Sequence, residues 1–499
     1  MVEEVEAYYM CVYLRDGKPI GHEGKPKNDF PASLEDAGKK PAEPKILPSG
    51  MEVISDQFIS AMMGYLEYVP LILSMAPNVS FRMVVHSLQK FLEENCVSCE
   101  RTPERVVYKF NLDQYPNVKR FQENMDAARS TSLALPRLLT VGLVTTLEYH
   151  LNLTMKEIAS KFPERIFERE KTISVSKAVK FSSMQELKDE LVNDEIDKVQ
   201  RENFETQVKW VIEKTGMSDF TDSYPDWPNI IELLERRNLF VHANGAVNDY
   251  YLKAASKYGF NKKGGSPVLG QELHAGRAYY SSSVSLVLHF GLMLLQIAWR
   301  KMSPDQSETA DRCVSELGYE LIGRGRHKLA IRILEFARQL RGVSEIRKRM
   351  NIVNLANAYK LSGDSQKSID TLSEMDWTAV SFAFKISVAA VKGEVDEVCE
   401  LMKRIGSEGE VTAQDYRGWP VFYGVRENPK FIAAFKTLFG IEYVAAAKAQ
   451  AGVGQVIEWM RKLPDDETKD EEMEEDEAQI EEPSPTLQPG GGDGKSDPE

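Results

Sequence analysis

The sequence has 499 residues, a length that corresponds to about three domains. Its composition, 42% hydrophobic and 28% charged, excludes a wholly disordered chain and predicts a globular protein with a sizeable core. The formal net charge is −14, but residues 465–499 contain 15 acidic and two basic residues, so the rest of the chain is nearly neutral. The acidity therefore does not exclude an RNA ligand.

The amino-terminal residues do not follow the pattern of a signal peptide, because Glu3, Glu4 and Glu6 occupy the place of a positively charged region. The longest apolar run, residues 284–299, is too short for a membrane span and predicts a buried core helix. Five cysteines in so long a chain indicate no disulfide framework. These features predict a soluble, cytoplasmic protein with no membrane partner.

Residues 1–55 are predicted to form a mobile amino-terminal arm. A strand-like segment at residues 8–14 precedes a stretch, residues 18–50, that is rich in Pro, Gly and Lys. This stretch has few large apolar residues, so it cannot bury enough surface to offset the entropy lost on ordering.

Residues 56–129 are predicted to form an extension of mixed structure. Its expected elements are helices over residues 58–73 and 84–92 and a strand over residues 105–110. Cys96 and Cys99 form a CxxC pair, but a structural zinc site needs four ligands and no second pair is present. The sequence therefore predicts no metal site and no cofactor.

Residues 130–302 are predicted to form a helical bundle. Helices are expected over residues 133–162 and 274–302, and residues 182–216 are expected to form one or two helices. A further helix, between residues 216 and 274, is described in the next paragraph. Pro136 would lie in the first turn of the first helix, where proline is tolerated. The buried stripe of residues 182–216 is predicted to consist of Phe204, Val208, Val211 and Ile212.

One helix of this bundle is predicted to begin at Pro228 and to end at Asn244-Gly245. Proline suits the first helical position, and Asn-Gly tolerates the left-handed conformation that ends a helix. The predicted buried stripe is Ile230, Leu233, Leu234 and Val241, and the predicted solvated face is Glu232, Glu235 and Arg236. Arg237 falls within the apolar stripe, where an unpaired charge is costly.

Arg237, Asn238 and His242 bring a guanidinium, a carboxamide and an imidazole to this helix. Asn238 and His242 are four residues apart and therefore share one edge of the stripe. The sequence Arg237-Asn238-x-x-x-His242, followed by Asn244-Gly245, resembles the R-x4-6-H motif of HEPN domains (higher eukaryotes and prokaryotes nucleotide-binding), whose commonest form is RNxxxH. Without that resemblance, Arg237 would be expected to extend its charge to the rim of the stripe, with His242 an ordinary residue of the last turn.

The HEPN resemblance covers residues 130–300. It implies a metal-independent endoribonuclease, common in toxin–antitoxin and antiphage systems, with Arg237, Asn238 and His242 as catalytic residues. It also implies a homodimer through the motif helix, which would bring two motifs into one cleft.

The segment at residues 250–271 is a candidate RNA-binding site, because it contains no acidic residue before Glu272. Its lysines are Lys253, Lys257, Lys262 and Lys263, and its aromatic residues are Tyr250, Tyr251, Tyr258 and Phe260. Lysines neutralise phosphates and aromatic faces stack bases. An ordinary flexible basic loop remains the alternative.

Residues 308–445 contain a repeated pattern that resembles tetratricopeptide helix pairs. Leu317-Gly318, Leu321, Gly325, Ala330 and Leu334 are repeated 38 residues later as Leu355-Ala356, Tyr359, Gly363, Ser368 and Leu372. The resemblance implies that these helices recruit a protein partner in a concave groove. Residues 464–499 are predicted to be a disordered acidic tail.

The predicted fold class is therefore mostly all-α: a HEPN-type helical bundle followed by a short tetratricopeptide-like α-solenoid, with disordered termini. The predicted function is endoribonuclease activity as a dimer, with RNA as substrate. The alternatives are a non-catalytic HEPN scaffold that dimerises and binds RNA or nucleotide, and a protein in which the repeats are the functional part and the bundle only oligomerises.

Overall fold

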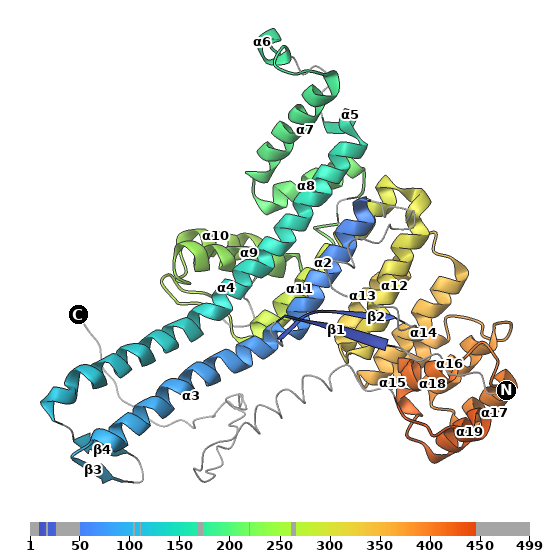
Figure 1. Ribbon diagram of the computed structural model, residues 1–499. Coiled ribbons are helices and arrows are strands. Elements are labelled where there is room, and N and C mark those ends of the chain that lie inside the picture. Colours follow the sequence, from blue (N-terminus) through green and yellow to red (C-terminus); the bar gives the residue numbers. More distant parts are fainter. Residues whose placement is uncertain are drawn as a thin grey trace, which may run out of the picture. The chain divides into compact units, whose positions relative to one another are not determined.

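The computed structural model describes residues 9–15, 18–25, 50–102, 105–109, 111–166, 173–218, 220–260 and 266–445. These residues are mostly α-helical, which confirms the predicted fold class at that level (Figure 1). Lys262, Lys263 and the predicted acidic tail lie outside the described residues, as does most of the predicted arm.

Two short antiparallel hairpins account for the strands. β1 (Tyr9–Arg15) pairs with β2 (Lys18–Lys25), and β3 (Ser98–Arg101) pairs with β4 (Val106–Lys109). The strands expected at residues 8–14 and 105–110 are thus present. β2 and the start of α2 (Gly50–Glu67) both fall inside the predicted arm, so part of that segment has regular structure.

α4 (Tyr115–Lys161) is a single helix of 47 residues that follows α3 (Val69–Asn95) and lies beside it (Figure 1). The predicted start near residue 133 is wrong, because Pro136 lies inside the helix and a different proline occupies its first turn. An interior proline lacks the N–H for one helical hydrogen bond. The Thr140 hydroxyl donates to the Pro136 carbonyl oxygen at 2.9 Å one turn later.

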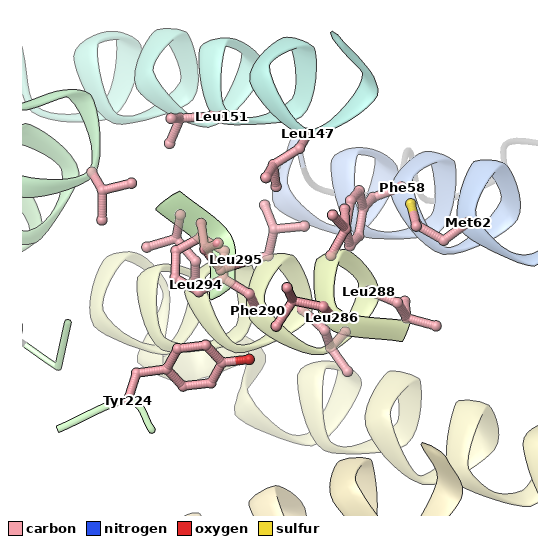
Figure 2. Close-up of a cluster of buried hydrophobic side chains, with 14 of the residues drawn as sticks. Phe58, Met62, Leu147, Leu151, Tyr224, Leu286, Leu288, Phe290, Leu294 and Leu295 are labelled. Carbon is pink, nitrogen blue, oxygen red and sulfur yellow. The ribbon is translucent and has the colours of Figure 1, made fainter. Parts of the chain in front are cut away.

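The main hydrophobic core forms where α2, α4 and α11 (Arg277–Met302) meet. Figure 2 shows Phe58 of α2 and Leu147 of α4 directed toward the part of α11 that contains Phe290, and all three side chains are buried. The predicted extension and the predicted bundle therefore share one core, and α4 runs through the expected boundary at residue 130.

α11 is the buried core helix expected over residues 284–299. By length and composition, Arg277–Met302 and the stretch Leu112–Lys161 could each cross a membrane, but 67% of the apolar window in Arg277–Met302 is buried inside the fold. The core helix of a soluble protein, which is mostly buried, also meets these criteria of length and composition.

The remaining bundle helices include the two over residues 182–216 and the motif helix that the sequence predicts, together with three further helices that it does not predict. They are α5 (Pro163–Ile166), α6 (Val175–Ala178), α7 (Met184–Gln200), α8 (Phe204–Thr215), α9 (Trp227–His242) and α10 (Asp249–Tyr258). The four residues of the stripe predicted for α8 are all buried. Asn203 caps α8 with its side chain, and Gly216 ends it in the left-handed conformation.

The carboxy-terminal helices over residues 307–405 pack against one another in sequence, and the last helix of the chain's described part packs on the sixth. The carboxy-terminal helices are α12 (Ser307–Gly323), α13 (His327–Gln339), α14 (Glu345–Leu361), α15 (Ser365–Leu372), α16 (Phe382–Lys392), α17 (Val395–Ile405), α18 (Ala413–Gly418) and α19 (Pro429–Phe439). Gly318 is a point of close crossing, because a Cβ there would lie 2.5 Å from Cδ2 of Leu334. The main core continues into α12–α14, and a second core lies among α14–α19.

We expect Gly291→Ala to lower the free energy of unfolding by about 1–3 kcal/mol, because overpacking a tight contact displaces its neighbours. A Cβ at Gly291 would lie 2.3 Å from Cζ of Phe58. The matched control is Gly64→Ala in α2, where a Cβ meets no atom within 4 Å. Urea unfolding followed by circular dichroism measures both, and an unchanged stability for Gly291→Ala would contradict this packing of α2 on α11.

Candidate functional site

The motif helix, α9, has the ends that its sequence predicts. Pro228 lies in its first turn, and Asp226 precedes it. After His242 the chain turns through Asn244 and Gly245, whose φ angles are +48° and +86°. A Cβ at Gly245 would lie 2.9 Å from the carbonyl oxygen of Leu273, so both the conformation and the close approach favour glycine.

The three motif residues lie in two different environments. Arg237 is half-buried and forms an ion pair with Glu148 of α4. Asn238 and His242 are exposed to solvent and, being four residues apart, lie on the same side of α9. The structure thus presents the amide and the imidazole together and holds the guanidinium toward α4.

Glu235, one turn before the exposed pair, extends this polar group. Burial raises the pKa of Glu235, while a hydrogen bond with the Asn238 side chain and the charge of Arg237 oppose that shift. The Asn238 amide is therefore anchored within its own helix. The Nε atom of Arg237 is buried and has no hydrogen-bond partner within the described part of the chain.

The helical wheel predicted from the sequence is wrong for three positions. The sequence predicts Glu232 and Arg236 on the solvated face of the helix, but both side chains are largely buried. It predicts Val241 in the buried stripe, but Val241 is 51% exposed. α9 packs against α4, α10 and α11, so its buried arc is wider than one apolar stripe. That arc includes charged residues because tertiary partners satisfy them.

Those partners form a buried polar network around Glu232. Its carboxylate accepts hydrogen bonds from Nε of Arg236 at 2.6 Å, from Tyr251 Oη at 2.8 Å and from Tyr279 Oη at 2.8 Å. Arg236 also donates to the carbonyl oxygen of His274 at 2.8 Å, and its guanidinium lies 4.1 Å from the centre of the Tyr279 ring. The network joins α9 to α10 and α11.

The network also fixes the protonation of its members. Burial alone would lower the pKa of Arg236, but Tyr279 and Glu232 raise it overall, so the guanidinium stays charged. Burial, followed by the charge of Glu232, raises the pKa of Tyr279 well above its usual value. The phenol therefore remains a hydrogen-bond donor near neutral pH.

The predicted RNA-binding segment begins as a helix, α10, rather than as the flexible basic loop given as its alternative. Tyr250 and Lys253 are exposed, and the ammonium group of Lys253 lies 5.8 Å from the centre of the Tyr250 ring. Lys257 donates to the Tyr258 hydroxyl at 2.6 Å, and both interact with Glu205 of α8. Only the first pair is thus free of carboxylate partners among the described residues.

Two aromatic residues of this segment are unavailable for stacking on bases. Tyr251 is fully buried and hydrogen-bonded to Glu232, and Phe260 is 5% exposed. Tyr251 and Phe260 contact each other with ring centres 5.4 Å apart. Their role is to pack α10 and the segment after it onto the bundle.

Two residues of α4 that the motif did not indicate hold the carboxy-terminal end of α9. Glu148 pairs with Arg237, and Arg137 donates to the Asn244 side-chain oxygen at 2.7 Å and to its carbonyl oxygen at 3.1 Å. Arg137 also forms an ion pair with Glu272, which lies opposite Ala246. The two partners in each pair are separated by about a hundred residues of sequence. A local sequence pattern therefore could not have predicted these pairs.

Among the described residues, no group of three or more His, Cys, Asp and Glu side chains is arranged to hold a metal ion. Cys96 is partly buried and Cys99 is exposed, and both are free thiols. Comparison of the chain with protein-family models, with curated proteins and with solved structures gave no match.

We expect Arg236→Ala to lower the free energy of unfolding by about 3–5 kcal/mol, because it leaves the buried Glu232 carboxylate without its cation. The matched variant on the same helix is Arg237→Ala, whose partner Glu148 is 30% exposed and can be solvated, so its cost should be nearer to 1 kcal/mol by the same measure. Urea denaturation of both variants gives the comparison. Equal losses would contradict the assignment of Arg236 to the buried side of α9.

Proposed function

We propose that this protein is a metal-independent endoribonuclease of the HEPN type that acts as a dimer. The observation that carries the proposal is the arrangement on α9: Asn238 and His242 are exposed on one side, and Arg237, adjacent to Asn238 in the chain, is held toward α4 by Glu148. An exposed histidine beside an arginine and an asparagine is a set suited to phosphate chemistry.

The reaction would begin when the 2′-oxygen of RNA attacks the adjacent phosphorus. The 2′-hydroxyl proton passes to a base, the bond from phosphorus to the 5′-oxygen breaks, and that oxygen receives a proton from an acid. The products are a 2′,3′-cyclic phosphate and a free 5′-hydroxyl. His242 is assigned the proton transfers, Arg237 the charge on the pentacoordinate phosphorus, and Asn238 the orientation of the reacting groups.

α10 directly follows the motif and supports an RNA substrate. Tyr250 is exposed and adjoins Lys253, so one base could stack while one phosphate is neutralised. Lys257 and Tyr258 could contribute when RNA competes with Glu205 for them. Lys262 and Lys263, also assigned to RNA binding, lie outside the described residues.

A dimer through the motif helix would supply what one chain lacks. One chain offers one His242, whereas an acid and a base acting together require two. Exposed apolar side chains are available for such a contact: Val241 on α9, and Leu138 and Tyr149 on α4, are 51%, 65% and 56% exposed. Leu138 and Tyr149 adjoin Arg137 and Glu148, the residues that hold α9.

In this proposal the protein works in the cytoplasm, in a toxin–antitoxin or antiphage setting, and the helices from residue 308 to 445 recruit a protein partner. The packing of consecutive helices from α12 to α17 supports a tetratricopeptide-like array.

The alternative is a non-catalytic scaffold of the same family that dimerises and binds RNA or nucleotide. It is favoured by the ion pair between Arg237 and Glu148, since a guanidinium already paired with a carboxylate is less available to a phosphate. In an enzyme, the substrate phosphate has to displace Glu148 or share the guanidinium with it.

We expect the purified protein to cleave single-stranded RNA in excess EDTA and to leave 2′,3′-cyclic phosphate ends. His242→Ala should reduce the cleavage rate by at least about 100-fold, in line with the loss of a general acid–base group. His274→Ala is the matched control, because this histidine is exposed and lies outside α9. Gel analysis of labelled RNA, with a substrate carrying 2′-deoxyribose at the cut site, measures the effect.

Cleavage that requires magnesium, that proceeds equally on the deoxy substrate, or that survives in His242→Ala would contradict the enzyme. RNA binding without any cleavage would instead favour the scaffold alternative.

We also expect Val241→Glu to convert the dimer to a monomer, because a charge at a buried apolar contact is costly. Ile369→Glu is the control, since Ile369 of α15 has a similar exposure of 50% but lies in the carboxy-terminal helices. Analytical ultracentrifugation of both variants gives the masses. A wild-type protein that is monomeric at micromolar concentration, or a Val241→Glu protein that remains dimeric, would contradict pairing through α9.

A further inference from the structure

A large cavity lies where the bundle meets the carboxy-terminal helices, and none of the three motif residues lines it. Its volume is about 1030 Å³, at the upper end of the range of about 300–1,000 Å³ for small-molecule sites. Its walls come from the segment between α8 and α9, from α11 and from α13.

Part of the cavity wall is apolar and partly aromatic. Phe220 and Tyr224 come from the segment before α9, Met293 and Ile297 from α11, and Phe336 from α13. Aromatic faces and a methionine thioether make favourable contacts with a flat ring. This part of the cavity therefore suits an aromatic group.

The cavity wall contains more basic than acidic residues, and some of the charged side chains are already paired with one another. The basic residues are Arg300, Lys301, Arg332 and Arg341, and the acidic residues are Asp226 and Glu335. Asp226 accepts a hydrogen bond from Arg332 at 2.6 Å, and Glu335 pairs with Arg338 and accepts one from the Tyr359 hydroxyl. Both carboxylates are already neutralised.

Two of the basic residues, Lys301 and Arg341, are exposed and form no ion pair with any described residue. Arg300 is paired with the buried Asp311, but its Nε atom is buried without a hydrogen-bond partner in the described structure. The cavity thus has unpaired cations at its rim and an unsatisfied donor nearby, a combination that favours an anion.

His289 adds hydrogen bonding to the wall without adding charge. Its Nδ1 atom lies 2.8 Å from the Tyr224 hydroxyl and 3.1 Å from Arg332. Burial, and then the charge of Arg332, lower the pKa of His289 to about 4, so the imidazole is neutral at pH 7. The anion-binding capacity therefore rests on Lys301, Arg341 and Arg300.

We propose that this cavity is a binding site for a phosphorylated aromatic metabolite of nucleotide size. The aromatic ring would lie against Phe220, Met293 and Ile297, and the phosphates would contact Lys301 and Arg341. An arginine fork and a lysine together match the geometry and charge of a phosphate chain. A neutral aromatic compound would contact only the apolar residues of the wall, and an inorganic anion would contact only the basic ones.

The site adjoins the start of the motif helix, because Asp226 is both part of the wall and the residue before Trp227. A ligand phosphate near Arg332 would compete with Asp226 for that guanidinium. The binding site itself does not depend on whether α9 cleaves RNA, and its test measures binding alone.

The test is isothermal titration calorimetry of the full chain with ATP in excess EDTA at pH 7. We expect one ATP to bind per chain, and tripolyphosphate and adenosine each to bind at least about tenfold more weakly. Arg341→Glu should weaken ATP binding by at least about tenfold, the loss expected for one charge-assisted hydrogen bond. Arg404→Glu is the matched control, an exposed arginine of α17 outside the cavity.

A second variant, Ile297→Trp, blocks the cavity sterically and should also abolish ATP binding, while thermal unfolding reports whether it is folded. Titrations with GTP, CTP and UTP test whether the cavity prefers one nucleobase over another. The proposal is overturned if none of the four nucleotides binds, if tripolyphosphate or adenosine binds as tightly as ATP, or if ATP binds equally well to wild type and to Arg341→Glu.

Discussion

The buried carboxylate of Glu232 is the constraint on which the geometry of the motif helix depends. A carboxylate removed from water is stable only when its oxygens are hydrogen-bonded, and here Arg236, Tyr251 and Tyr279 supply three donors. Because these donors come from α9, α10 and α11, they allow essentially one rotation of α9 about its axis. That rotation turns Asn238 and His242 to solvent and Arg237 toward α4.

α4 holds the opposite side of the same helix. Glu148 pairs with Arg237, and Arg137 binds the turn at Asn244 that ends α9. Arg236 and Arg237 thus make different contacts: Arg236 joins α9 to α10 and α11 through Glu232, and Arg237 joins α9 to α4 through Glu148. Polar contacts on two sides of α9 would preorganise the motif residues for the proton transfer and phosphate recognition proposed above.

The bundle and the carboxy-terminal helices are joined through a common core and a shared cavity. Arg332 of α13 contacts Tyr224, His289 and Asp226, so the first helices after residue 308 are linked to the start of α9. The cavity lies at this junction, and Arg332, Tyr224, His289 and Asp226 all line it. Its exposed basic residues are the basis for the anionic ligand proposed above.

Local periodicity was enough to predict the helical fold class, the buried stripe of α8, the buried core helix α11 and both ends of α9, because these features depend on spacing and on proline, glycine and asparagine at particular positions. The sequence also indicated Arg237, Asn238 and His242 as a group. The tertiary structure alone decided which side of α9 is buried, that Glu148 holds Arg237, and that α4 continues through Pro136. These outcomes depend on partners distant in the chain: a charge is buried only when such partners satisfy it, and a helix interrupted by proline persists only when packing outweighs the lost hydrogen bond.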